Sequence, residues 1–195
     1  MTDHGGGPAR AQPRRPTAWV LVAVVALVVV GVLVVRSRLV GSLDLHGATV
    51  VREEVHSALL DRDLEQITVL PSGFRKTDHR ALVVLLHGRG DAPAGRVNTA
   101  LTAALDAAGK RAPVVLLANG GESSYYHDRD DGPWGSYLSE ELIAATVSRF
   151  SLDQSRIAYA GISMGGAGAL ELVHQSSARQ CGVAALAPAL WRAAS

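Results

Sequence analysis

Hydrophobic positions divide the chain into one long apolar run near its beginning and a later part in which short apolar runs alternate with polar loops. Residues 1–16 are rich in Gly, Pro and Arg and lack apolar periodicity, which predicts a disordered tail. Residues 18–35 contain no charged side chain. As a helix this run would be roughly 27 Å long, close to the thickness of a bilayer's hydrocarbon core. We therefore expect a transmembrane helix over residues 17–36.

A cleaved signal peptide is the alternative for this run, because Arg10, Arg14 and Arg15 precede it. The run is longer than the usual h-region, however, and it ends in Arg36-Ser37-Arg38 without a small-x-small cleavage site. These features favour an uncleaved anchor followed by a linker over residues 37–47. We expect a single-pass protein of the cell membrane, with the tail inside and the following domain on the extracytoplasmic side.

The pattern after the linker is that of a soluble domain, which we place at residues 48–195. Predicted strands cover residues 48–57, 64–70, 81–86, 114–118 and 182–187. The first two read as an antiparallel edge pair, whereas the third and fourth are continuous apolar runs typical of strands buried on both faces. A helix predicted over residues 98–108 joins those two runs, so strand, helix and strand form a parallel crossover. The pattern therefore predicts an α/β domain with a mostly parallel sheet.

The stretch from Arg156 to Gly168 carries the most specific chemical signal. Strand character over residues 157–160 and helical character over residues 167–174 flank Gly161-Ile162-Ser163-Met164-Gly165. This order predicts a sharp turn with Ser163 exposed at its apex as a nucleophile. Gly161 and Gly165 are expected where a side chain would collide with the neighbouring strand or helix. The alternative is a glycine-rich turn without chemistry.

A second turn, His87-Gly88-Arg89-Gly90-Asp91, directly follows the predicted strand at residues 81–86. In an open α/β sheet, ligands bind outside the carboxyl ends of the strands, so this turn and Ser163 should lie at the same edge. We expect the main-chain N–H groups of Arg89 and Met164 to form an oxyanion hole. His87 itself is predicted to hydrogen-bond within the turn rather than to carry a proton.

A long loop over residues 119–137 contains four aromatic residues and a histidine. Loops of this length are usually functional or disordered, and the aromatic residues favour the wall of a pocket. Asp128, Asp130 and Asp131 could hold a cation, but an exposed acidic turn explains them more simply, so no metal site is expected. Ser139 is predicted to cap the next helix. The predicted substrate-binding residues are His87, Gly88, Tyr125, Tyr126, His127 and Trp134.

Composition narrows the range of partners. With 195 residues and a formal net charge of +1, the chain has no excess of positive charge for a polyanion, so we expect no nucleic-acid partner. Cys181 is the sole cysteine, which excludes an intramolecular disulfide. Nothing in the motifs implies a metal or an organic cofactor.

Taken together, these motifs resemble the α/β-hydrolase superfamily, and specifically its esterase D-like group, which includes S-formylglutathione hydrolases, feruloyl and acetyl esterases and mycolyltransferase antigens. The resemblance covers roughly residues 50–191. It rests on Leu85-Leu86-His87-Gly88, on the loop from Asn119-Gly120-Gly121 to Trp134-Gly135-Ser136-Tyr137, on Glu141-Leu142, and on Gly161-Ile162-Ser163-Met164-Gly165-Gly166. It implies a three-layer α/β sandwich.

In this superfamily an acid and then a histidine follow the nucleophile, on loops after later strands. The only histidine after Ser163 is His174. It would lie about 16 Å along the helix that follows the turn, which is too far to act as the base. Of the earlier histidines, only His127 lies in the pocket loop. The resemblance therefore implies a domain that is incomplete at its C-terminus and lacks its catalytic acid and histidine.

Three functions are compatible with these residues. The first is a membrane-anchored serine ester hydrolase, which acts on a small-molecule, lipid or sugar ester through Ser163. The second is an acyltransferase of the mycolyltransferase type, in which an alcohol replaces water. The third is a non-catalytic binding module that keeps the hydrolase fold without its triad.

Overall fold

The structure is a computed structural model that describes residues 43–175 and 180–190. These residues belong to a single unit that begins at Leu43. The tail and transmembrane helix predicted at residues 1–36 lie outside the described residues, so both stay predictions. In the described part of the chain, no helix combines the length and the hydropathy that are needed to cross a membrane.

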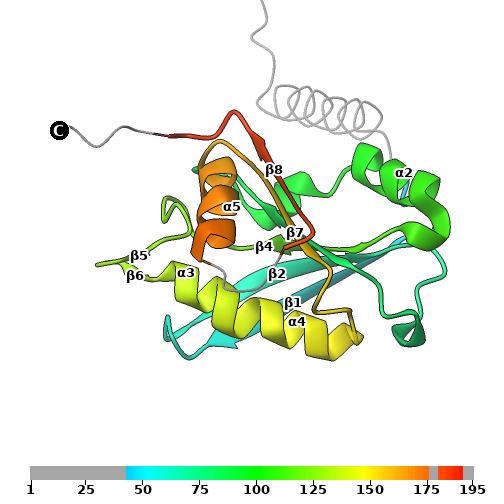
Figure 1. The fold of residues 1–195 in the computed structure, drawn as a ribbon, viewed down its shortest axis with the longest axis horizontal. Helices are drawn as coiled ribbons and strands as arrows, with labels where there is room; N and C mark the ends of the chain where they lie inside the picture. The colour runs from blue at the N-terminus through cyan, green and yellow to red at the C-terminus, as the bar shows by residue number, and fades with distance from the viewer. Residues whose placement is uncertain (1–42, 176–179, 191–195) are drawn as a thin grey trace, which may run out of the picture. The chain divides into compact units, whose positions relative to one another are not determined.

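The described chain alternates strands and helices after an initial pair of strands (Figure 1). The strands are β1 (Thr49–Ser57), β2 (Arg62–Leu70), β3 (Leu82–Leu86), β4 (Val114–Ala118), β5 (Asp128–Arg129), β6 (Gly132–Pro133), β7 (Ile157–Ile162) and β8 (Gly182–Leu186). The α-helices are α2 (Thr99–Ala108), α3 (Trp134–Ser136), α4 (Ile143–Phe150) and α5 (Met164–Gln175). Short 3-10 segments are η1 (Lys76–Asp78), η2 (Pro93–Arg96) and η3 (Gly109–Arg111), and η4 (Tyr137–Leu142) is π-helical.

The main sheet has the order β1-β2-β4-β3-β7-β8, and β5 and β6 form a separate hairpin. β1 pairs with β2, and β2 with β4, in antiparallel fashion. The pairs β3–β4, β3–β7 and β7–β8 are parallel. Leu86 at the end of β3 is in register with both Ala118 and Gly161. The carboxyl ends of the three central strands therefore share one edge, as the sequence predicts.

Alternate residues of the central strands face two separate hydrophobic clusters. Leu82, Val84 and Leu86 of β3 belong to the cluster that contains residues of α4 and α5. Val83 and Leu85 pack against the other cluster, which contains Leu105 of α2. The continuous apolar run of β3 thus reflects burial on both faces. Figure 1 shows α2 apart from α4 and α5, consistent with helix layers on the two sides of the sheet.

Of two predicted helix starts, one agrees with the structure and the other does not. α2 follows an Asn98 cap, whose side chain accepts a hydrogen bond of 2.9 Å from the Leu101 N–H. The helix predicted to start at Ser139 begins instead at Trp134. Asp128 accepts bonds from the N–H and hydroxyl of Ser136, at 2.9 and 2.6 Å, and so holds the first turn. The Ser139 hydroxyl donates back to the Gly135 carbonyl at 3.0 Å, so Ser139 lies within the helix and is not its cap.

Candidate active site

Ser163 is the single residue between β7 and α5. β7 ends at Ile162 and α5 begins at Met164, so the chain changes from strand to helix at this one position. The φ angle of Ser163 is 55°, in the left-handed region, which costs a non-glycine residue roughly 1–2 kcal/mol. The residue is exposed. The predicted strand, sharp turn and helix are therefore confirmed, with the serine at the apex.

Two glycines make this turn possible. A methyl group on Gly161 would lie 2.2 Å from the carbonyl oxygen of Gly165 in the first turn of α5. A methyl group on Gly165 would lie 2.2 Å from the carbonyl oxygen of Leu86 and 2.7 Å from that of His87. Both positions therefore require glycine, the first because of the helix and the second because of the end of β3. The close contacts press α5 against the two strand ends that flank Ser163.

The main chain of Ser163 is fixed by the segment that follows β8. The Ser163 N–H donates to the carbonyl oxygen of Leu186 at 3.0 Å. The Ser163 carbonyl accepts from the N–H groups of Ala167, at 3.1 Å, and Ala189, at 3.0 Å. The strained backbone is thus held by three hydrogen bonds, and the hydroxyl is left free: it has no hydrogen-bond partner among the residues that the structure describes.

The loop that begins at His87 lies against Ser163. A methyl group built on Gly88 would be 3.8 Å from Ser163 Cβ and 3.6 Å from the carbonyl oxygen of Ile162. Since the register of β3 and β7 aligns Leu86 with Gly161, both loops leave the sheet side by side. The predicted proximity of the two turns is confirmed.

The two N–H groups that the sequence predicts for an oxyanion hole have suitable surroundings. Met164 is the first residue of α5, and the first N–H groups of a helix lack intrahelical acceptors. Arg89 is exposed, and within the described residues its N–H has no acceptor. The next two N–H groups are occupied, because Gly90 donates to the Glu122 carbonyl at 2.9 Å and Asp91 to that of Gly88 at 3.2 Å. The oxyanion role of Arg89 and Met164 stays a prediction.

An ion pair between Asp91 and Arg96 braces the same loop. The other Asp91 oxygen accepts from the Ala92 N–H at 2.9 Å. The hydrogen bond from Ala92, followed by the charge of Arg96, lowers the pKa of Asp91 despite an opposing effect of burial. Asp91 is therefore ionised at neutral pH, and the segment between Gly88 and η2 is held at both ends.

His87 has the structural role that the sequence predicts for it. The residue is 1% exposed. Its Nε2 accepts from the Gly120 N–H at 3.2 Å, which leaves Nδ1 as the donor to the Gly88 carbonyl at 2.9 Å. Burial lowers the pKa of His87, so the ring is neutral at pH 7. His87 thus connects the loop beside Ser163 to the loop after β4.

Stability is expected to fall as the pH decreases through the range in which His87 titrates. Because burial lowers the folded-state pKa below its ordinary value of 6.5, the unfolded chain takes up a proton at a higher pH than the folded chain. The His87 contribution is present above pH 6.5 and is lost as the pH falls toward the folded-state pKa. Urea unfolding at a series of pH values would measure this decrease. His87→Gln, which cannot titrate, should show a shallower dependence; an identical slope would contradict the assignment.

Three of the predicted substrate-binding side chains lie in the core. His87, Tyr126 and Trp134 are 1%, 0% and 5% exposed. The Tyr126 ring fills the space that a methyl group on Gly120 or Gly168 would occupy, at 2.0 and 2.4 Å, and its hydroxyl donates to the His87 carbonyl at 3.2 Å. Tyr126 therefore ties the loop after β4 to α5 and to the turn after β3, in the core of the domain.

Tyr125 and His127, in contrast, line a pocket of about 310 Å³ beside α5. Ala167 and Ala189 line it as well, and both donate hydrogen bonds to the Ser163 carbonyl. The pocket therefore begins one helical turn from Ser163. Its wall combines the side chains of Leu170 and Leu190 with an ion pair of 3.8 Å between His127 Nδ1 and Glu171 Oε1.

A buried polar network supports the loop after β4, and the sequence analysis does not include it. Gln66 of β2 is 1% exposed. Its amide donates to the Tyr137 hydroxyl at 2.6 Å and accepts from the Asn119 N–H at 2.8 Å. Asn119 in turn accepts from the Gly121 N–H at 3.0 Å. The sequence signal that could have revealed this network is Gln66, a polar residue at an inward-facing position of a predicted strand.

Metal-binding residues do not gather in the described part of the chain: no group of three His, Cys, Asp or Glu side chains there could hold an ion. Asp128, one of the three loop aspartates, is engaged by Ser136. Although burial raises its pKa, hydrogen bonds from Ser136 and Gly135 outweigh this effect and lower it. Asp128 therefore stabilises the first turn of α3.

No histidine is hydrogen-bonded to Ser163 among the described residues. His87 is buried with both ring nitrogens bonded, and His127 pairs with Glu171. His174 is exposed near the end of α5, about 16 Å of helical rise from Ser163. Within the described residues, the Ser163 hydroxyl is therefore exposed and is not hydrogen-bonded to a histidine.

Comparisons with known proteins agree with this geometry. The model of the family described as "Putative esterase" matches residues 57–195. No curated protein matches the sequence. A ferulic acid esterase superimposes with a TM-score of 0.65 and 22% identity, over 72% of this chain and 59% of its own.

Two other solved structures are similar. For an S-formylglutathione hydrolase from Agrobacterium tumefaciens the TM-score is 0.57 and the identity 23%, over 73% of this chain and 59% of the other. For fluorophosphonate-binding serine hydrolase F of Staphylococcus aureus, the TM-score is 0.61 and the identity 18%, over 72% of this chain and 57% of the other. The chain therefore spans less than two thirds of the length of each of these structures.

Proposed function

The chain belongs to the esterase family, as an esterase D-like α/β-hydrolase, and from this membership we propose that the protein is a serine carboxylic ester hydrolase with Ser163 as its nucleophile. The observation that carries the proposal is the exposed Ser163 at φ 55° between β7 and α5, with Gly88 against it. A strained, non-glycine residue at the carboxyl edge of a parallel sheet is a recurring way to present a nucleophile.

The reaction follows from the groups around the serine. Ser163 Oγ forms a bond to the ester carbonyl carbon while its proton passes to a general base. The N–H groups of Arg89 and Met164 stabilise the negative charge on the former carbonyl oxygen. The alcohol leaves with a proton, and a water molecule then attacks the acyl-enzyme to release the carboxylic acid and restore the serine.

The general base and its acid are assigned to sequence outside the described residues. Neither His87, His127 nor His174 is placed to receive the proton of Ser163. A serine hydroxyl without a base is a weak nucleophile. Residues 43–190 on their own are therefore expected to turn over an ester slowly, at most with the fraction of rate that oxyanion stabilisation alone supplies.

The substrate is proposed to be a small-molecule ester. The pocket of about 310 Å³ beside Ser163 has an aromatic wall at Tyr125 and aliphatic side chains at Leu170 and Leu190. Such a lining suits an apolar or aromatic part of an ester. One of the similar structures is a complex of a fungal ferulic acid esterase with ferulic acid, which supports an aromatic acid as one candidate for the acyl group.

A fluorophosphonate probe tests the nucleophile. In the full-length protein, we expect covalent labelling on the peptide that contains Ser163, identified by mass spectrometry, and no labelling after heat denaturation. The reagent reports an activated serine, because an ordinary serine hydroxyl does not react at a comparable rate. Labelling at another serine, with Ser163 unmodified, would overturn the assignment.

A further inference from the structure

A second pocket, of about 570 Å³, lies at the edge of the sheet opposite Ser163. It is formed by residues that precede three parallel strands: Arg80 before β3, Arg111 before β4 and Arg156 before β7. Arg156 and Ser163 flank β7, so the two sites are roughly 20 Å apart at about 3.3 Å per strand residue. The pocket is therefore separate from the candidate active site.

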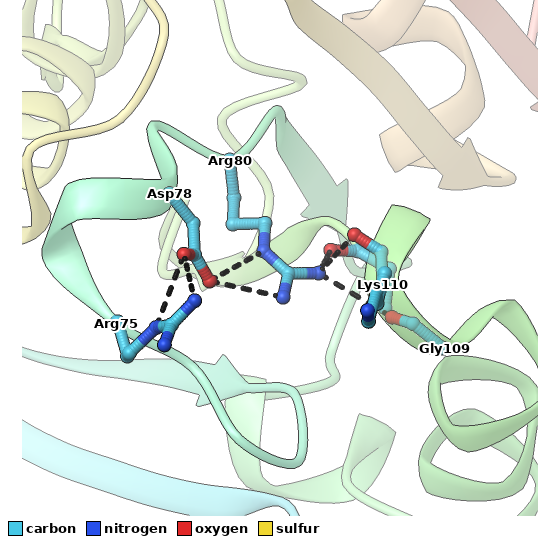
Figure 2. Close-up of polar contacts among 6 residues, drawn as sticks. Arg75, Asp78, Arg80, Gly109 and Lys110 are labelled. Carbon is cyan, nitrogen blue, oxygen red and sulfur yellow. Dashed lines mark hydrogen bonds and ion pairs between the residues drawn. The ribbon is translucent and has the colours of Figure 1, made fainter.

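The floor of this pocket is a rigid arrangement around Arg80 (Figure 2). Arg80 is 9% exposed. Its Nη1 donates to the main-chain carbonyls of Gly109, Lys110 and Ala112 at 3.3, 2.6 and 3.1 Å. Its Nε and Nη2 donate to Asp78 Oδ2 at 3.3 and 3.1 Å. Arg80 thereby fixes η1 and η3 relative to each other, and its guanidinium is largely consumed by these bonds.

Asp78 neutralises only part of the positive charge. Its other oxygen, Oδ1, accepts from Nε and Nη2 of Arg75 at 3.3 and 3.1 Å. One carboxylate is thus shared by two guanidinium groups, as Figure 2 shows. The hydrogen bond from Arg80 is the largest of the effects that lower the pKa of Asp78, with Arg75 acting in the same direction and burial opposing it. Asp78 is therefore charged at neutral pH, and the pair of arginines keeps a net positive charge.

Three further cations around the pocket are free or weakly paired. Lys110 and Arg111 are exposed, and neither side chain has a hydrogen-bond or ion-pair partner in the described part of the chain. The nearest carboxylate oxygen to Arg156 belongs to Asp153, 3.9 Å from Arg156 Nε, at the limit of an ion pair. The cations that line the pocket are Arg75, Arg80, Lys110, Arg111 and Arg156, and Asp78 is the one acidic side chain in its lining.

We propose that this pocket binds a phosphate group. Arginine guanidinium groups recognise phosphate oxygens by paired hydrogen bonds, and lysine adds a mobile positive charge. The unpaired donors of Lys110 and Arg111 belong to a short segment that Arg80 holds in place through the carbonyls of the same segment. The charged ends of Lys110 and Arg111 thus lie next to the Arg75–Asp78–Arg80 cluster in one concave surface, where a bound phosphate would contact several cations at once.

The phosphate can come from a free phosphorylated small molecule or from the headgroup of an anionic phospholipid, because both present the same group to the pocket. The proposal does not depend on the ester hydrolase function, since the pocket shares no residue with the surroundings of Ser163.

Calorimetric titration of the full chain with inorganic phosphate tests the free-ligand source. In Lys110→Gln/Arg111→Gln, we expect the dissociation constant to rise by about tenfold or more, since two charge-assisted contacts are lost. Arg52→Gln/Arg149→Gln is the matched control, because it removes the same charge from exposed residues on β1 and α4. The control should change the dissociation constant by less than about twofold.

Flotation with phosphatidylcholine vesicles, with and without phosphatidic acid, tests the lipid source. Binding that the N-terminal residues contribute is the same in both variants, so only the difference that Lys110 and Arg111 make is informative. A loss in the pocket variant with phosphate, with vesicles or with both supports the proposal and identifies the source. Binding of neither probe, or an equal loss in the control variant, overturns it.

Discussion

Replacing Ser163 with alanine is expected to lower kcat/KM for a p-nitrophenyl ester by about 10⁴-fold or more in the full-length protein. The hydroxyl is exposed at a strained position and has no structural partner among the described residues. Its removal therefore takes away the group that forms the acyl-enzyme, without disturbing a hydrogen bond of the fold. The loss should appear in kcat, because the proposed contacts of the ester with the pocket beside α5 are unchanged.

Two measurements separate loss of the nucleophile from loss of the fold. The main chain of Ser163 keeps its bonds to Leu186, Ala167 and Ala189 in the alanine variant, so the melting temperature should change by only a few degrees. Ser148→Ala, at an exposed position of α4, is a matched control and should leave both quantities unchanged. Retention of most of the esterase activity by Ser163→Ala would exclude Ser163 as the nucleophile.

The parts of the fold that depend on local pattern were predictable. The runs that became β3 and β4 are apolar at every position because their alternate residues face two different clusters. The turn at Ser163 could be located because its requirements lie within a few residues, in Gly161 and Gly165. The loop beginning at His87 could be placed beside it because parallel strands bring their carboxyl ends to one edge.

The parts that depend on contacts distant in sequence were not predictable. Tyr126 and Trp134 have the composition of a pocket wall, but Gly120, Gly121 and Gly168 leave spaces that their rings fill in the core. Those spaces exist only when α5 and the loop after β4 are in contact. The helix predicted from Ser139 starts earlier because Asp128, eight residues before Ser136, supplies the cap.

The basic pocket likewise depends on residues that are distant in sequence, so it could not be predicted from local pattern. Arg75, Lys110 and Arg156 belong to short segments with one or two cations next to a turn, which are common in any sequence. They gather because the amino ends of parallel strands, like the carboxyl ends, meet at one edge of the sheet. No motif signals such a site, since its residues come from three separate connections between strands. The strand pattern alone could have suggested that cations preceding β3, β4 and β7 converge.

Gly165→Ala is expected to destabilise the domain by about 3 kcal/mol or more. The new methyl group would lie 2.2 Å from the Leu86 carbonyl oxygen and 2.7 Å from that of His87. These are main-chain atoms of β3 and of the loop beside Ser163, so no side-chain rotation relieves the collision. α5 has to move away from the sheet, and Ser163 moves with it. Urea denaturation followed by circular dichroism would measure the loss, and esterase activity should disappear together with the fold.

Gly182→Ala provides the comparison for this effect. Gly182 begins β8, parallel to β7, and a methyl group there would meet only Ala158 Cβ, at the ordinary contact distance of 3.9 Å. Because alanine restricts the unfolded chain more than glycine, this variant should be neutral or more stable by up to about 1 kcal/mol. The same chemical change thus has opposite effects at two positions in the same parallel part of the sheet. If both variants unfolded at the same urea concentration, the close packing of α5 on the end of β3, on which the geometry around Ser163 depends, would be incorrect.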